Sequence, residues 1–280
     1  MTLFQMIHLF YKEFLEQVKK DPIPDWAATL AFYFMLSIFP LLIFILALLP
    51  YLPIHADQIY ELIHDHVPGE LADLFTNTIL EVIAVPQGGL LSFGILATIW
   101  SASNGMNALL RALNRAHNID ETRSFLKLRL ISIFMTLAMI VVLVVTLLLP
   151  VFGRVILEGI AEFVYIPEAT FELLNRLRWV IGVVIMTTVL MGVYYIAPNK
   201  RLSFRYIIFG ALFATISWQL ISYGFSVYVS NFGDYTATYG SLGGVIILMF
   251  WFFLSGLSLV IGGEINATLH NMKHKLSKPY

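Results

Sequence analysis

Six apolar stretches, each about 20 residues long, constrain the fold of this chain more than any other feature of its sequence. A helix needs about 20 mostly apolar residues to cross a hydrocarbon core about 30 Å thick. The stretches are 26–49, 90–110, 130–150, 179–197, 204–229 and 242–267. Only 12% of the 280 residues are charged, against about 25% in soluble domains. The sequence therefore predicts an all-α, polytopic membrane helix bundle with about six transmembrane helices.

The segments outside these stretches are polar or amphipathic. Residues 1–25 predict an amphipathic helix rather than the apolar run of a secretory signal. Its apolar face consists of Leu3, Phe4, Ile7, Phe10, Tyr11, Phe14, Leu15 and Val18. This face either lies along the cytoplasmic membrane surface or packs on the protein itself.

We expect a single membrane domain over 1–280, with the six spans in 26–268. Amphipathic helices are expected on the outer side at 54–84 and 154–176, and a cytoplasmic tail at 269–280. If the N-terminus is cytoplasmic, 14 of the 17 Lys and Arg residues fall in inner segments, and only Arg154, Arg176 and Arg178 fall in outer ones. Positive charge accumulates on the cytoplasmic side of membrane proteins. Both termini are therefore predicted to be cytoplasmic.

Several kinds of chemistry are excluded or disfavoured by composition. Cysteine is absent, which excludes disulfides, thiolate metal sites and cysteine nucleophiles. His64 and His66 lie near acidic residues, but side chains two positions apart diverge on a helix, so a solvated face is favoured over a metal site. His270 and His274 are expected at the surface. We find no phosphate-binding glycine loop or hydrolase motif, and we expect no enzyme activity, cofactor or metal.

Seven short motifs follow one another along nearly the whole chain. They are AATLAFY (27–33), SIFP (37–40), WSAS (100–103), ALNR (112–115), APNK (197–200), YGSLGG (239–244) and GGEIN (262–266). Together they resemble the YihY/BrkB family of bacterial inner-membrane proteins, once labelled ribonuclease BN. The resemblance implies a six-span protein of the bacterial plasma membrane, associated by name with virulence and considered for transport. It supplies no catalytic residues. A nuclease would need acidic groups on the inner face, and the only acids in the inner loops, Asp120 and Glu121, are best explained as charge balance.

Polar residues recur at helical spacing in and just beyond the second stretch. This stripe consists of Trp100, Ser103, Asn104, Asn107, Arg111 and Asn114. At about 100° per residue they fall on one helical face. An unsatisfied polar group costs several kcal/mol in hydrocarbon, so such a face needs water or partners. We predict that its central members line a hydrated cavity open to the cytoplasm; these are Ser103, Asn104, Asn107 and Arg111. A dry contact with another helix is the alternative.

Similar polar faces occur in three other stretches. Their candidate pathway residues are Tyr33 and Ser37 in the first, Gln219 and Ser222 in the fifth, and Asn266 in the sixth. Hydroxyl and amide groups also join membrane helices, so packing remains an open alternative. Glu264 is the only carboxylate inside a stretch. It is expected near the inner interface, either in a structural ion pair or contact with an amide on another helix, or as a proton- or ion-coupling group.

Two functional hypotheses follow. The first is a transporter, exporter or lipid translocator that moves a neutral, anionic or amphipathic substrate through a polar cavity between the first, second, fifth and sixth spans. Membrane lipids are its expected partners; nucleic acid is not, and the sequence does not define an oligomeric state. The second is a non-transporting membrane scaffold that organises the cell envelope.

Overall fold

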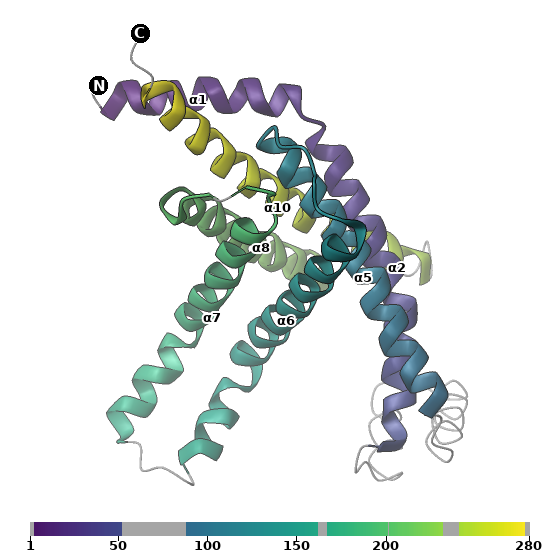
Figure 1. Ribbon diagram of the computed structural model, residues 1–280. Helices are drawn as coiled ribbons and strands as arrows, with labels where there is room; N and C mark the ends of the chain where they lie inside the picture. The colour runs from purple at the N-terminus through teal and green to yellow at the C-terminus, as the bar shows by residue number, and fades with distance from the viewer. Residues whose placement is uncertain (1–2, 52–87, 162–166, 201, 232–240, 278–280) are drawn as a thin grey trace. The chain divides into compact units, whose positions relative to one another are not determined.

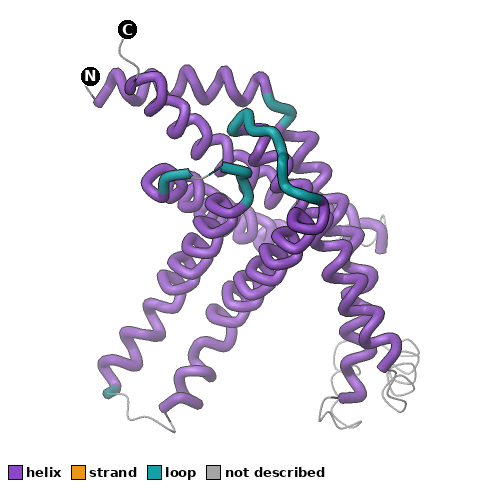
Figure 2. Tube along the Cα trace, in the orientation of Figure 1, coloured by secondary structure: helices purple, strands orange, loops and turns teal. Residues whose placement is uncertain are grey.

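The computed structural model describes residues 3–51, 88–161, 167–200, 202–231 and 241–277, and its regular elements there are helices (Figure 1, Figure 2). They are α1 (Leu3–Lys20), α2 (Ile23–Leu48), the short 3-10 helix η1 (Leu49–Tyr51), α5 (Gly88–Ala116), α6 (Phe125–Ala161), α7 (Glu168–Ile196), α8 (Phe204–Asn231) and α10 (Ser241–Ser277). No strand occurs in this part of the chain. The predicted outer helix at 54–84 lies outside the described residues.

Each predicted apolar stretch falls in one of the long helices α2, α5, α6, α7, α8 and α10. Within the described ranges, four helical segments are long and apolar enough to cross a membrane, namely Ile23–Leu48, Phe125–Val144, Phe204–Tyr228 and Gly243–Met272. The apolar part of α7, Val180–Ile196, is shorter. The α5 helix does not reach this hydropathy, because the polar stripe interrupts it. The all-α polytopic fold is confirmed.

Large apolar side chains cover the outside of these helices. Phe134, Val184 and Phe209, on α6, α7 and α8, are each more than half exposed, at 62%, 56% and 56%. Exposing apolar surface to water costs about 25 cal/mol per Å², whereas lipid tails are as apolar as these side chains. Such surfaces are suited to a bilayer and not to water.

The contacts divide the chain into two compact units. The larger holds Met1–Phe32 and Ser103–Tyr280, and the smaller holds Tyr33–Ala102. The helices α2 and α5 each run from one unit into the other. In the smaller unit they meet at Gly94, where an added Cβ would come within 2.7 Å of the Phe44 backbone nitrogen. Only glycine allows the two helices to approach so closely there.

The larger unit is held together by close packing of α8 against α10 and α7, of α6 against α7, and of α1 against α10 (Figure 1). The backbones of α8 and α10 approach most closely at Gly210 and Gly262, where a Cβ on either residue would overlap the other helix. The buried hydroxyl of Tyr194 on α7 donates to the backbone oxygen of Leu259 on α10, at 2.7 Å. Small residues and buried polar contacts are typical of helix packing in membranes.

Helix α1 is amphipathic as predicted, and it is anchored through its C-terminal half. The Gln17 amide donates to the backbone oxygen of Ala116 on α5 at 2.7 Å, and its oxygen accepts from the Thr268 hydroxyl on α10 at 3.3 Å. Nearer the N-terminus, Phe4 and Tyr11 stay exposed, at 79% and 60%. The second half of the helix therefore packs on the protein, while contact of the exposed apolar residues with the membrane stays a prediction.

The expected outer helix at 154–176 is not one separate element. Residues 154–161 continue α6 and residues 168–176 begin α7, with the described chain interrupted between them. The sequence pattern placed the end of the span at Pro150, but α6 runs on beyond it. A proline removes one backbone hydrogen bond, and membrane helices tolerate it because neighbouring groups satisfy the freed backbone carbonyl.

Candidate functional site

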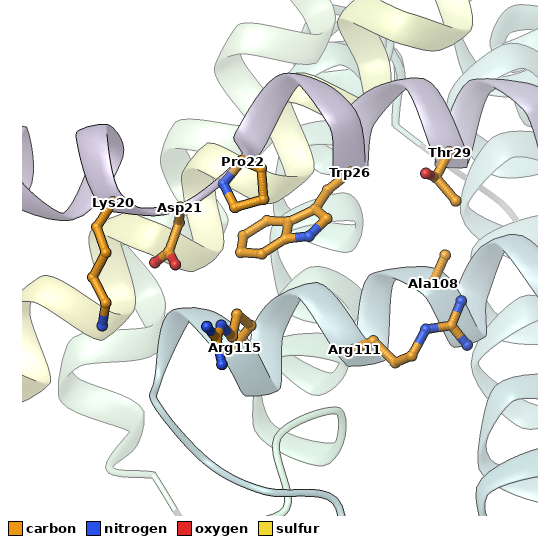
Figure 3. Close-up of a pocket in the computed structure, with 8 residues that line it drawn as sticks. All are labelled: Lys20, Asp21, Pro22, Trp26, Thr29, Ala108, Arg111 and Arg115. Carbon is orange, nitrogen blue, oxygen red and sulfur yellow. The ribbon is translucent and has the colours of Figure 1, made fainter.

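A pocket of about 430 Å³ lies in the larger unit, where the turn between α1 and α2 faces the C-terminal turns of α5 (Figure 3). Its lining residues are Lys20, Asp21, Pro22, Trp26, Thr29, Ala108, Arg111 and Arg115. On α2 they are Trp26 and Thr29, three positions apart, and on α5 they recur at i, i+3 and i+7, so each helix contributes a single face. The volume is within the range of small-molecule sites.

The pocket is cationic and open to solvent. Lys20, Arg111 and Arg115 are exposed side chains, and Figure 3 shows the Trp26 ring between α2 and α5, with the two arginines on α5. Asp21 is the one acidic residue of the lining, and it is only 5% exposed. Burial raises the pKa of Asp21, although the charges of Lys20 and Arg115 oppose this effect. The lining as a whole favours an anionic ligand.

The predicted stripe on α5 does not have a single environment. Ser103 is fully buried, and the Asn104 side-chain oxygen accepts a hydrogen bond from Arg129 of α6 at 2.6 Å. Asn107 is half-buried, and its side-chain oxygen has no hydrogen-bond partner among the described residues. Arg111, one turn further, lines the pocket. The stripe thus reaches the pocket at Arg111, whereas Asn104, two turns nearer the N-terminus of α5, lies against α6.

The other candidate residues lie in separate places. Tyr33 and Ser37 belong to the smaller unit, where the Ser37 hydroxyl donates to the Phe34 backbone oxygen of its own helix at 2.6 Å. In the larger unit, Ser222 accepts from the Trp251 indole at 3.2 Å, joining α8 to α10. The remaining two candidates are Gln219, half-buried on α8, and Asn266, buried on α10. Contact of these five with a substrate stays a prediction.

Asn266 and Glu264 are buried where α10 meets its neighbours. The Asn266 side-chain oxygen accepts from the Gly210 backbone N–H of α8, at 2.9 Å. Glu264 is fully buried, and its carboxyl oxygens have no hydrogen bond of good geometry within the described part of the chain. The amide of Gln17 and the charges of Lys20 and Asp21 act on it electrostatically. Gln17 and Lys20 belong to α1 and Asp21 follows it, so the groups that act on Glu264 come from that part of the chain. Its role as a structural or coupling group stays a prediction.

A network of hydrogen bonds fixes the end of α5 and the loop that follows it. Asn118, at φ 51°, ends the helix, because its N–H and that of Ile119 bond to the Arg115 and Asn114 carbonyls at 2.9 Å each. The Asn114 amide donates to Glu121 at 2.8 Å, and its oxygen accepts from the Asn199 backbone N–H at 2.7 Å. Two predicted motifs, ALNR and APNK, are thus brought together by this loop.

Glu121 and Arg123 form the ionic part of this network. Arg123 binds the Glu121 carboxylate through two nitrogens, at 2.6 and 2.8 Å, and donates to the Ala197 carbonyl at the end of α7 at 2.8 Å. The hydrogen bond from the Arg123 side chain holds the pKa of Glu121 below its usual value. The Glu121 carboxylate therefore stabilises the loop through its bonds to Arg123 and Asn114. Among the described residues, no group of three His, Cys, Asp or Glu residues could hold a metal ion.

His270 was expected at the surface, and this prediction is wrong. Its ring lies edge-on to that of His117, with 6.1 Å between the ring centroids, and both side chains are partly buried. Burial lowers the pKa of His117 to about 3, with smaller contributions from His270 and Lys200. At neutral pH His117 is therefore uncharged where it packs against His270.

The sequence did not single out Lys20, Asp21, Trp26 or Arg115 as site residues. Lys20 and Asp21 lie at the end of α1 and in the turn after it, while Trp26 and Arg115 lie on α2 and α5. The sequence does not show that these helices meet across about 90 positions of chain. The two prolines at the start of α2, Pro22 and Pro24, mark the turn that forms one wall of the pocket.

The apolar, lipid-suited helices and the buried polar contacts between them define a polytopic helical membrane protein. The family model "Virulence factor BrkB" matches residues 14–279. The chain belongs to this family of membrane proteins.

Individual relatives agree with this assignment. A Bacillus subtilis protein named as ribonuclease-like protein YfkH is 46% identical over 264 residues, which cover 94% of this chain and 96% of the relative. A "UPF0761 membrane protein" of Photobacterium profundum is 26% identical over 262 residues, which cover 92% of this chain and 79% of that protein. No solved structure matches the chain.

Proposed function

We propose that this chain is a transporter or lipid translocator of the bacterial plasma membrane that takes up an anionic amphiphile from the cytoplasmic side. The observation that supports this most directly is the pocket, where three cationic side chains surround a space of about 430 Å³ next to helices suited to lipid. A substrate with an anionic head and an apolar tail matches both features. Anionic lipid headgroups are attracted to such Lys and Arg clusters by about 1 kcal/mol per charge.

The proposed orientation puts the pocket at the cytoplasmic membrane surface. Lys20, Arg111 and Arg115 all belong to segments that the distribution of positive charge assigns to the inside. Asn107, one helical turn from Arg111, has a buried side-chain oxygen without a hydrogen-bond partner among the described residues, so a polar group continues this face of α5 toward the membrane interior. A headgroup bound by the arginines would meet this amide next.

We infer no nuclease activity, although a relative has a ribonuclease-like name. Metal-dependent hydrolysis needs carboxylates that are free to bind the metal. Glu121 is bound by Arg123 and Asn114, which leaves exposed Asp120 alone beside it. Removal of both acids would therefore disturb the loop rather than abolish a reaction.

The alternative function is a membrane scaffold. It is favoured by the candidate residues that make direct helix contacts, since Asn104 binds Arg129, Ser222 binds Trp251 and Asn266 binds Gly210. A polar residue that is fully used in packing is not available to a substrate. The two functions differ in whether purified protein moves a molecule across a bilayer.

The test is reconstitution of the full chain in liposomes with a fluorescent anionic phospholipid, whose movement between leaflets is followed by quenching of the outer leaflet. We expect protein-dependent movement that falls about tenfold or more in an Arg111→Gln, Arg115→Gln double variant, because hydrogen bonds to charged groups contribute about 1.5–3 kcal/mol. The control is Lys127→Gln, which removes an exposed cation of the predicted inner side that does not line the pocket. If the protein produces no movement of any anionic amphiphile, the scaffold function is favoured instead.

A further inference from the structure

The charges of the pocket define more than a general preference for anions. The lining holds three cations, Lys20, Arg111 and Arg115, and a single carboxyl group, that of Asp21, so two positive charges are in excess. A phosphate diester has one negative charge. A phosphate monoester has between about 1.5 and 2 negative charges at pH 7, because its second pKa is about 6. The excess charge of the lining therefore accommodates the dianion of a monoester as well as its singly charged, protonated form.

Asp21 supplies a second, independent constraint. It is 5% exposed, and its Oδ2 atom has no hydrogen-bond partner among the described residues. A buried carboxyl oxygen without a partner is costly, so a ligand that offers a hydrogen-bond donor is favoured there. A phosphate monoester in its singly charged form has one P–OH group, which can donate to this oxygen, whereas a diester of the same charge has no such donor.

Two other residues limit what else the pocket can offer. The Thr29 hydroxyl already donates to the Asp25 carbonyl of its own helix at 2.8 Å, so it is not a free donor for an anion. The Trp26 ring borders the pocket between α2 and α5 (Figure 3) and gives it one apolar wall. Lys20 donates one of its three N–H bonds to the Asn118 side-chain oxygen, at 2.6 Å. Its other two N–H bonds, the two arginines and Asp21 are thus left to recognise the phosphate, beside a surface for an apolar group.

We infer that this pocket is a binding site for a phosphate monoester group, held by Lys20, Arg111 and Arg115, with Asp21 accepting the hydrogen bond of its P–OH group. The inference deepens the proposed function and rests on it, since it names the headgroup that enters the transport pathway. The same chemistry occurs in soluble phosphate monoesters and in lipids with a terminal phosphate, such as phosphatidic acid.

The first experiment measures binding to the full chain in detergent. The probes are short-chain phosphatidic acid, short-chain phosphatidylglycerol with the same acyl chains, and glycerol phosphate. We expect phosphatidic acid to bind about tenfold more tightly than the diester, and Arg115→Gln to remove most of this difference while Lys127→Gln retains it. Phosphatidic acid binding far more tightly than glycerol phosphate identifies a lipid source, and equal binding a soluble one. Equal affinity for the monoester and diester lipids would overturn the inference.

The second experiment tests the role of Asp21 with two inorganic anions. Sulfate has two negative charges and no hydroxyl donor at pH 7, whereas phosphate retains a proton. We expect phosphate to bind about tenfold more tightly than sulfate, and Asp21→Asn to reduce this preference to about threefold or less, because the asparagine amide can donate to either anion. A preference for phosphate that is unchanged in Asp21→Asn would contradict the assigned role.

The two proposals can fail separately. Monoester-selective binding without movement of lipid across liposomes would refute transport and leave the binding site. Movement of lipid that does not distinguish monoesters from diesters, with equal binding of both, would refute the site and leave transport.

Discussion

The Arg129 guanidinium of α6 donates a hydrogen bond to the Asn104 side-chain oxygen of α5, with 2.6 Å between the two atoms. Arg129 is only 8% exposed, in a helix that is otherwise strongly apolar. Because a buried guanidinium needs hydrogen-bond acceptors, Asn104 ties α5 to α6 within the larger unit. An amide that was predicted to line a cavity therefore joins two helices, and its contact with a cavity stays a prediction.

Replacing Asn104 by leucine should lower the free energy of unfolding by about 1–2 kcal/mol, since interhelical hydrogen bonds in membranes have this magnitude. Chemical unfolding in detergent micelles measures the change. Arg129→Met should have a similar effect, and the double variant should lose less stability than the two single variants combined. Strictly additive losses would show that the contact does not stabilise the protein.

Much of the fold follows from the lengths and periods of the apolar stretches. A run such as 204–229 predicts α8 (Phe204–Asn231) almost to the residue, because a membrane span is set by the bilayer thickness. The apolar stretches predict the ends of helices less well, because α6 continues past Pro150, where the stretch ends. The stretch 90–110 was predicted as a span, but α5 is not among the described segments that are apolar enough to cross a membrane, because the polar stripe lowers the apolar content of that helix.

The candidate site was predicted only in part, for a physical reason. Periodicity gives the direction in which a side chain points from its own helix, but not which neighbouring element contacts it at each position along the helix. Asn104 and Arg111 share one face of α5, yet Arg129 covers the first and the pocket opens at the second. The partners come from α6 and from the α1–α2 turn, and only the folded chain shows this.

The glycine contact between α8 and α10 gives a test of packing. Gly210→Ala should destabilise the protein by about 1–3 kcal/mol, because its methyl group would overlap the Gly262 carbonyl and the Asn266 side chain. The matched control is Gly224→Ala on the same helix, where an added Cβ meets nothing within 4 Å. Thermal unfolding in detergent compares the two. Equal melting temperatures would contradict the close approach of the two backbones.

His117 predicts a loss of stability at acidic pH. Its pKa is lowered from 6.5 to about 3 in the folded protein, so the unfolded chain binds a proton at a higher pH than the folded one. Above about pH 7 His117 is neutral in both states and costs no stability. As the pH falls toward 3, the free energy of unfolding decreases, and the loss reaches about 2 kcal/mol at pH 5. His117→Gln should remove this part of the difference in stability between pH 7.5 and pH 5. An unchanged difference would indicate that His117 is protonated in the folded state.

The orientation of the chain is tested by reporter fusions. Fusions after Arg115 and after Pro198 should report a cytoplasmic location, because positive charge is concentrated in both segments. Fusions within 55–89 and 231–239 should report an external one. A single reversed reporter would invalidate the six-span topology, and it would also move the pocket away from the side where we place it.

Cysteine accessibility tests whether the polar face of α5 is hydrated above the pocket. The chain has no cysteine, so single substitutions have no background. We expect Asn107→Cys and Arg111→Cys to react with a water-soluble maleimide added from the cytoplasmic side, because Arg111 lines the pocket and the half-buried Asn107 lies one turn further. Leu109→Cys should be inert, since Leu109 is 1% exposed. Asn104→Cys should react more slowly than Asn107→Cys, because that position packs against Arg129. If Asn107→Cys is as inert as Leu109→Cys while Arg111→Cys reacts, the pocket ends at Arg111 and the stripe above it is a dry helix contact, as a scaffold would have.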